Sequence, residues 1–214
     1  MLRALVRFLV ALVVGGLLLP PVLSWVVTLI QARLTLPQDP WAAAVGAGLG
    51  LLMMLLWRPS WFWHTWVHEH CHLIACLVLF TKVRGLSATD GRGGAVDYDA
   101  VDALRGTLIA IAPYTLPLLL LPLLLAQELL PVGPWRQVST GLASLAFFSH
   151  LHGLWHNIRL NLTGSDSDLV RTGRPLAAVL IVLGLALTLA LVLLVLWGDP
   201  LADGVAQAAK LVSG

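Results

Sequence analysis

Charged side chains are scarce in this 214-residue chain. Asp, Glu, Lys and Arg together make up 11% of the residues, against about 25% in a typical soluble protein. Hydrophobic residues make up 58%, and the mean hydropathy is +0.88. The net charge of +2 is not clustered, and no basic, aromatic surface is visible in the sequence. This composition argues against a nucleic-acid partner and predicts a protein embedded in the lipid bilayer by several helices.

Cysteine and glutamate are the rarest chemically active residues. The two cysteines, Cys71 and Cys76, are five positions apart in one apolar run. On a helix they point to different faces, so they do not form a disulfide framework and say nothing about the compartment. The two glutamates are Glu69 and Glu128. A carboxylate in the middle of an apolar run is costly and is treated as a functional residue by default, which singles out Glu69.

The apolar runs predict an all-α fold, a single membrane-embedded domain of about six transmembrane helices. We expect the catalytic core at about 60–175 and a small polar loop or β-hairpin after the third run. The first run is expected to be a retained helix kinked at Pro20-Pro21, and the prolines of the fourth to kink that helix as well. The six predicted spans are 4–30, 41–57, 61–81, 107–130, 138–160 and 175–197.

Loop charges give a weak indication of orientation. With six spans, the side that holds the 82–105 and 159–174 loops collects eight Lys and Arg residues, and the other side collects five. The positive-inside rule then places these loops in the cytoplasm and both termini outside. Arg3 and Arg7, at the N-terminus, favour the opposite orientation.

The third run contains the motif His68-Glu69-His70-Cys71-His72, which is HExxH. Residues four apart lie on the same face of a helix, so His68 and His72 can hold one metal ion. Glu69 lies about 100° further round the helix, where its carboxylate can take a proton from water at the ion. With seven histidines and two glutamates in the chain, random order produces this pattern about 0.002 times per chain.

All seven histidines fall in two clusters, 64–72 and 150–156. Their separation predicts that two membrane helices meet around a common site. His64 is expected near the mouth of that site and His70 on the opposite side of its helix as a packing residue. For His150, His152 and His156, a role beside the ligands, a substrate contact and a helix-contact hydrogen bond remain open.

A catalytic zinc ion normally has three protein ligands, and HExxH supplies two. Asp166 and Asp168 are the candidates for the third, because they are the carboxylates near the second histidine cluster. Their alternative role is to cap a helix that begins near Ser167, with Ser165 or Asp166 as the cap.

The motif helix, the polar Gly-rich segment after it and the late aspartate together resemble the site-2 protease family of intramembrane zinc metalloproteases. The elements that carry this resemblance are Gly93-Gly94-Ala95-Val96 and Ser165-Asp166, within about 60–175. Within the family, the chain looks most like the small bacterial members that lack a PDZ domain. The family has an Asp-Gly element at this aspartate. The chain departs from it, because Ser167 follows Asp166 and Leu169 follows Asp168.

The resemblance implies one zinc ion per chain, bound by His68, His72 and Asp166, with Glu69 as the general base and Asp168 outside the ligand set. It also implies that Asn157 or Asn161, together with Gly93 and Gly94, binds the substrate. The expected protein is a multi-pass metalloendopeptidase of the bacterial cytoplasmic (inner) membrane, with a membrane-protein substrate. The alternatives are a catalytically inactive homologue that acts as a membrane binding protein, a di-iron protein and a haem protein. The oligomeric state is open.

Overall fold

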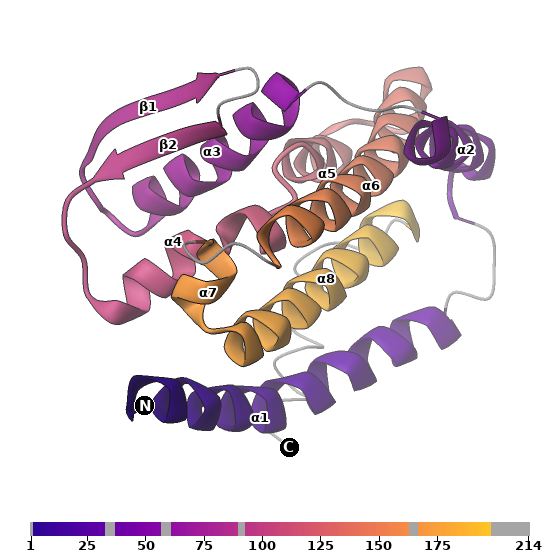
Figure 1. Ribbon diagram of the computed structural model, residues 1–214. Helices are drawn as coiled ribbons and strands as arrows, with labels where there is room; N and C mark the ends of the chain where they lie inside the picture. The colour runs from indigo at the N-terminus through magenta and orange to yellow at the C-terminus, as the bar shows by residue number, and fades with distance from the viewer. Residues whose placement is uncertain (1, 33–36, 57–60, 90–92, 163–166, 198–214) are drawn as a thin grey trace. The chain divides into compact units, whose positions relative to one another are not determined.

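A computed structural model describes residues 2–32, 37–56, 61–89, 93–162 and 167–197 (Figure 1). The fold is largely helical, with one two-stranded sheet. Along the chain the elements are α1 (Leu2–Ala32), α2 (Pro40–Leu56), α3 (Trp61–Val78), β1 (Val83–Thr89), β2 (Gly93–Tyr98), α4 (Ala103–Thr115), α5 (Leu120–Leu129), α6 (Pro134–Asn161), α7 (Asp168–Thr172) and α8 (Arg174–Trp197).

The chain divides into two compact units, which are described separately. The site unit comprises residues 1–11, 58–116 and 153–181, and the second unit comprises residues 12–57, 117–152 and 182–214. The site unit contains α3, the sheet, α4 and α7. Helices α1, α6 and α8 each contribute one end to it.

Two helices are long and apolar enough to cross a membrane: α1, over Ala4–Ala32, and α8, over Arg174–Trp197. A third candidate is the bent pair α4 and α5, so the described residues give two or three such spans and not the six predicted. Helix α2 has 17 residues, which makes it short for a span. Helices α3 and α6 have the expected length, but their histidines, arginines and amides lower their hydropathy.

The predicted fourth span is broken into α4 and α5, whose axes differ by 77°. The break begins at Leu116, the residue before Pro117. The backbone of Leu116 is extended, with φ −93° and ψ 109°. Proline disfavours helical geometry in the residue before it, so the chain leaves the helix at this point. In contrast, α1 runs through Pro20-Pro21 as one continuous helix.

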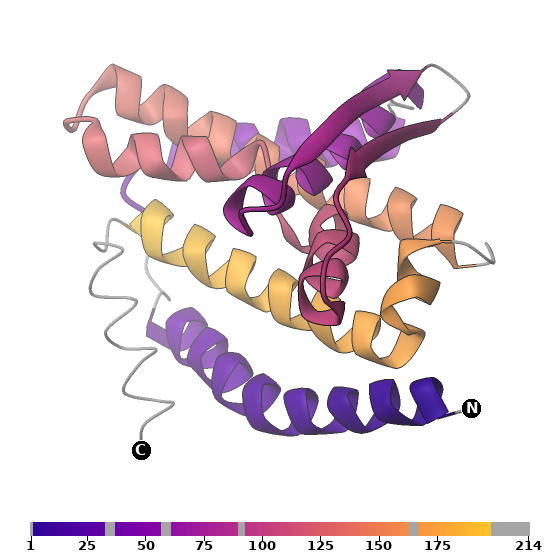
Figure 2. The ribbon, with the colours of Figure 1, turned by 90° about the vertical axis from the view of Figure 1, so that its left-hand side faces the viewer.

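The polar segment after α3 was expected to be a polar loop or a β-hairpin, and it forms a β-hairpin. Strands β1 and β2 are antiparallel, with Ala88 opposite Gly94 and Val83 opposite Tyr98. Both strands lie against α3, as both ribbon views show (Figures 1 and 2). Gly94 makes this contact possible, since a Cβ atom there would lie 2.5 Å from Cγ of Glu69 and 2.8 Å from Cγ2 of Thr65. The hairpin backbone therefore lies directly on the HExxH helix.

A buried apolar cluster supports the site unit from the side of α4. It consists of Ile111, Tyr114, Leu154, Leu169 and Ala177 and so draws on α4, α6, α7 and α8. Burial of these side chains joins the short α7 to longer helices. A helix of five residues is too short to be stable alone, so this packing fixes its position.

The second unit contains a close crossing of α2 and α6. Gly46 and Gly50, spaced as in GxxxG, both lie at this contact. A Cβ atom at Gly46 would lie 2.0 Å from the carbonyl oxygen of Gly141, and one at Gly50 would lie 2.6 Å from Cβ of Phe148. Small residues at this spacing are typical of helix contacts in membranes.

Candidate metal centre

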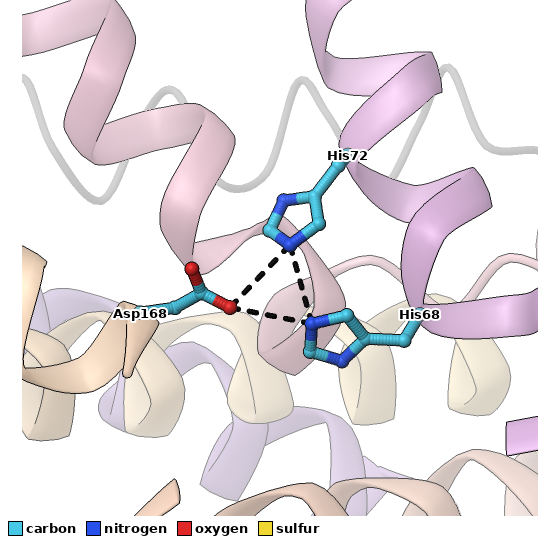
Figure 3. Close-up of side chains that lie close together, drawn as sticks. All are labelled: His68, His72 and Asp168. Atoms are coloured by element: carbon cyan, nitrogen blue, oxygen red, sulfur yellow. Dashed lines mark hydrogen bonds and ion pairs between the residues drawn. The ribbon is translucent and has the colours of Figure 1, made fainter. Parts of the chain in front are cut away.

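Helix α3 places His68 and His72 on one face, as the motif predicts. Their Nε2 atoms are 3.2 Å apart, and both point towards the same region (Figure 3). The side chains of His68 and His72 are 15% and 11% exposed. The pair is therefore held largely out of solvent, with a route of access at one side.

Asp168, in the first turn of α7, completes a group of three. Its Oδ2 atom lies 3.2 Å from Nε2 of His68 and 3.4 Å from Nε2 of His72 (Figure 3). Asp168 was expected outside the ligand set, but the structure brings it into the one group of the described residues that could hold a metal ion. Asp166, expected as the third ligand, lies outside the described residues. A helix starts where the sequence predicted one, but Ser167 is its N-cap, and this register turns Asp168 towards α3.

Hydrogen bonds to the backbone fix His72 and the start of α7, the helix that carries Asp168. Nδ1 of His72 lies 2.7 Å from the carbonyl oxygen of Ile109 in α4. A carbonyl oxygen only accepts, so Nδ1 carries the proton, and in the neutral ring Nε2 presents a lone pair. At α7, the hydroxyl of Ser167 donates to the carbonyl oxygen of Asn161 at 2.8 Å. This bond ties the start of α7 to the end of α6.

The electrostatics of the group favour an ionised carboxylate. Burial by itself raises the pKa of the Asp168 carboxyl, but His68 and His72 outweigh burial and hold this pKa below its usual range. Two neutral imidazoles and one carboxylate carry a net charge of −1. That charge suits a divalent cation, and these are ligand types that zinc accepts.

Glu69 is 6% exposed and lies under the hairpin, where Gly94 approaches it closely. It lines the same cavity as His68 and His72. Gly93 has a different role, since its φ of +79° is in the left-handed region and an added Cβ would meet open space. The two glycines thus serve the turn and the close approach to Glu69, respectively.

The cavity beside the three groups has a volume of about 970 Å³ and is lined within the site unit. Both asparagines expected to bind substrate, Asn157 and Asn161, line it. The amide nitrogen of Asn161 donates to the carbonyl oxygen of Asn157 at 2.9 Å. Asn161 is therefore committed to the end of α6, whereas the side chain of Asn157 makes no such bond to the described residues.

The other histidines separate into three kinds. His64 and His156 line the cavity and stack with ring centroids 4.1 Å apart, so the two histidine clusters do meet. His70 packs away from the cavity, with Nδ1 2.7 Å from the carbonyl oxygen of Trp66 and its ring stacked on Trp66. His150 and His152 belong to the second unit.

Two residues of the site have no signature in the sequence. Tyr114 is fully buried and packs edge-on to His68, with centroids 6.0 Å apart. Arg7, near the start of α1, donates to the carbonyl oxygen of Val170 in α7 at 3.3 Å. The alternation of apolar and polar residues cannot reveal either contact, since both depend on how distant segments pack.

Among the described residues, His68, His72 and Asp168 form one group able to hold a metal ion. A tetrahedral ion with bonds of about 2.0–2.1 Å holds its ligand atoms about 3.3–3.4 Å apart. The three separations, 3.2, 3.2 and 3.4 Å, are close to this spacing. Comparison of the chain with protein-family models, with curated proteins and with solved structures found no match.

Proposed function

We propose that this chain is a zinc-dependent metalloendopeptidase of the membrane that cleaves a peptide bond in or near a membrane-spanning segment of another protein. The observation that carries the proposal is the triangle of His68 Nε2, His72 Nε2 and Asp168 Oδ2, beside the buried carboxylate of Glu69. Three protein ligands with one open position, next to a separate carboxylate, are typical of zinc hydrolases.

Each residue has a distinct task in this mechanism. When bound, a zinc ion supplies Lewis acidity to the scissile carbonyl and to water. Glu69 accepts the proton of the attacking water and passes it to the leaving amine. The His72 ring is held in the required tautomer by Ile109, which is the usual arrangement of a metal-binding histidine.

Strand β2 provides a place for an unwound substrate. β1 occupies one edge of β2, and Gly93–Val96 of β2 line the cavity. A peptide whose helix has been opened can add to the remaining edge through backbone hydrogen bonds. Gly94 would then hold the peptide next to Glu69, and Asn157 would donate its amide to a substrate carbonyl.

The composition supports a reaction that takes place in the membrane. Helices α1 and α8 are candidate spans, and their exposed side chains include Leu9, Val13, Leu17 and Val182. We propose a multi-pass protein of the bacterial cytoplasmic membrane. The cavity would then give a bilayer-embedded substrate access to water and to the base.

The test uses the full-length protein in lipid nanodiscs, loaded with zinc, and a library of single-span membrane segments. The expected result is a new N-terminus detected by mass spectrometry, loss of cleavage with a chelator and with Glu69→Gln, and recovery on adding zinc to the chelated wild type. Metal-loaded wild-type protein that binds segments without cutting any would instead support an inactive homologue that acts as a binding protein.

A further inference from the structure

The cavity contains an uneven distribution of charge. Its carboxylates are Glu69, Asp102 and Asp168, and its guanidinium groups are those of Arg7 and Arg171. The carboxylates of Asp102 and Asp168 already bond to other groups of the protein, whereas most donors of the two guanidinium groups do not. This difference decides which charges are available to a substrate.

Asp102 and Asp168 are engaged with the protein. Asp102 caps α4, where one carboxylate oxygen accepts the backbone N–H groups of Leu104 at 2.9 Å and Arg105 at 3.0 Å. Its other oxygen lies 3.5 Å from Nε of Arg105. These bonds lower the pKa of the Asp102 carboxyl. Asp168 faces the two histidines, as described above, so neither carboxylate is left to neutralise a distant arginine.

Arg7 and Arg171 are exposed and adjacent in the fold. Arg7 uses one donor on the carbonyl oxygen of Val170, the residue before Arg171, which places both arginines at the same end of α7. A guanidinium has five N–H donors, so most of those of Arg7 remain available. Arg171 makes no ion pair with any residue in the described part of the chain.

The charge of Arg171 also acts on Tyr98, at the far end of β2. Burial raises the pKa of the Tyr98 hydroxyl, and the positive charge of Arg171 acts on it in the opposite direction. Tyr98 and Arg171 both line the cavity. Tyr98 is four residues beyond Gly94 in β2, which corresponds to about 13 Å of extended strand.

We propose that Arg7 and Arg171 select a substrate with an acidic side chain about four residues from the bond that is cut. A substrate segment paired with the edge of β2 brings its bond to Glu69 at Gly94 and its acidic residue, opposite Tyr98, to the arginines that line the same cavity. The inference rests on the proposed function for the position of the cut bond. Binding of the acidic segment can be measured without any cleavage.

The binding experiment uses metal-loaded Glu69→Gln protein in nanodiscs of neutral lipid, with fluorescent segments that differ only by Asp or Asn at one scanned position. We expect Asp to bind about fivefold more tightly at one position, less so at high salt. Arg7→Glu and Arg171→Glu should each remove this preference, and the double variant should favour Lys. Arg136→Glu, outside the cavity, is the matched control. Equal affinity for Asp and Asn at every position would overturn the inference.

The cleavage experiment separates the two proposals. Wild-type protein that cuts Asp and Asn segments equally well would leave the protease intact and refute the acidic preference. Binding that anionic lipid weakens, to the same extent for Asp and Asn segments, would assign the arginines to lipid headgroups and also refute it. Selective binding of Asp segments without cleavage would support the arginine site and refute the protease.

Discussion

Nδ1 of His72 donates to the carbonyl oxygen of Ile109 at 2.7 Å, so a residue of α4 sets the protonation of a residue of α3. In the neutral ring, the lone pair of Nε2 then faces Oδ2 of Asp168 at 3.4 Å. Two atoms that both present electron pairs repel each other unless a proton or a cation lies between them. The site is therefore arranged to exchange a proton on His72 for a metal ion.

Removal of Asp168 should abolish stable metal binding. Asp168→Ala leaves two imidazoles, which is one protein ligand fewer than a catalytic zinc site normally has. We expect about one zinc ion per chain in the wild type and a loss of affinity of at least 100-fold in the variant, measured by metal analysis of folded, purified protein. Asp166→Ala is the matched control and should keep its zinc. Loss of zinc from Asp166→Ala, with zinc retained by Asp168→Ala, would identify Asp166 as the third ligand.

Glu69→Gln should separate metal binding from turnover. Glutamine keeps the size of the side chain but cannot accept the proton of water. We expect unchanged zinc content and a fall in cleavage of at least 100-fold. Cleavage at the wild-type rate would mean that another group acts as the base.

Gly94→Ala should impair cleavage far more than Gly85→Ala. The new methyl group would lie 2.5 Å from Cγ of Glu69 and 2.7 Å from the carbonyl oxygen of Ser87, so the strand must move away from α3. At Gly85, the nearest atom would be Oδ2 of Asp97 at 3.6 Å, an ordinary contact. We expect a loss of about tenfold or more for Gly94→Ala with zinc retained, because a small displacement of the strand misplaces the substrate. Equal activity of the two variants would show that β2 does not position the substrate.

Gly46→Ala and Gly48→Ala form a matched pair for the second unit. An alanine methyl at Gly46 would lie 2.0 Å from the carbonyl oxygen of Gly141, whereas Gly48 has nothing within 4 Å. Overpacking of this kind typically costs about 1–3 kcal/mol, while alanine at the open position of a helix is neutral or stabilising. The melting temperature in detergent should fall for Gly46→Ala alone. A fall for neither variant would mean that α2 does not pack on α6 through these residues.

Sequence patterns predicted the features that depend on neighbouring residues. The spacing of His68 and His72 put both rings on one face, and the Gly-rich segment predicted a polar loop or a hairpin. Most helix ends also lie close to the expected positions, because apolar runs and Pro or Gly punctuation are local. The position of Asp168 beside the histidines depends on the register of a five-residue helix, which is set by its packing and by the bond from Ser167 to Asn161.

The number of membrane spans was predicted less well for a related reason. Apolar length alone did not register that Leu116 and Pro117 would end α4 and turn the chain by 77°. Nor did it give weight to the polar residues that keep α3 and α6 below the hydropathy of α8. Those polar residues, the histidines above all, make up the site, so function and hydropathy compete in the same helices.

The separation of the ligands along the chain also sets the order of events during synthesis. His68 and Asp168 are 100 residues apart. A nascent chain that has emerged only as far as α6 offers the histidine pair without its carboxylate. The third donor appears when α7 is made and docks against α4. A metal ion held by all three groups would therefore be captured only after α7 has been made and has docked against α4.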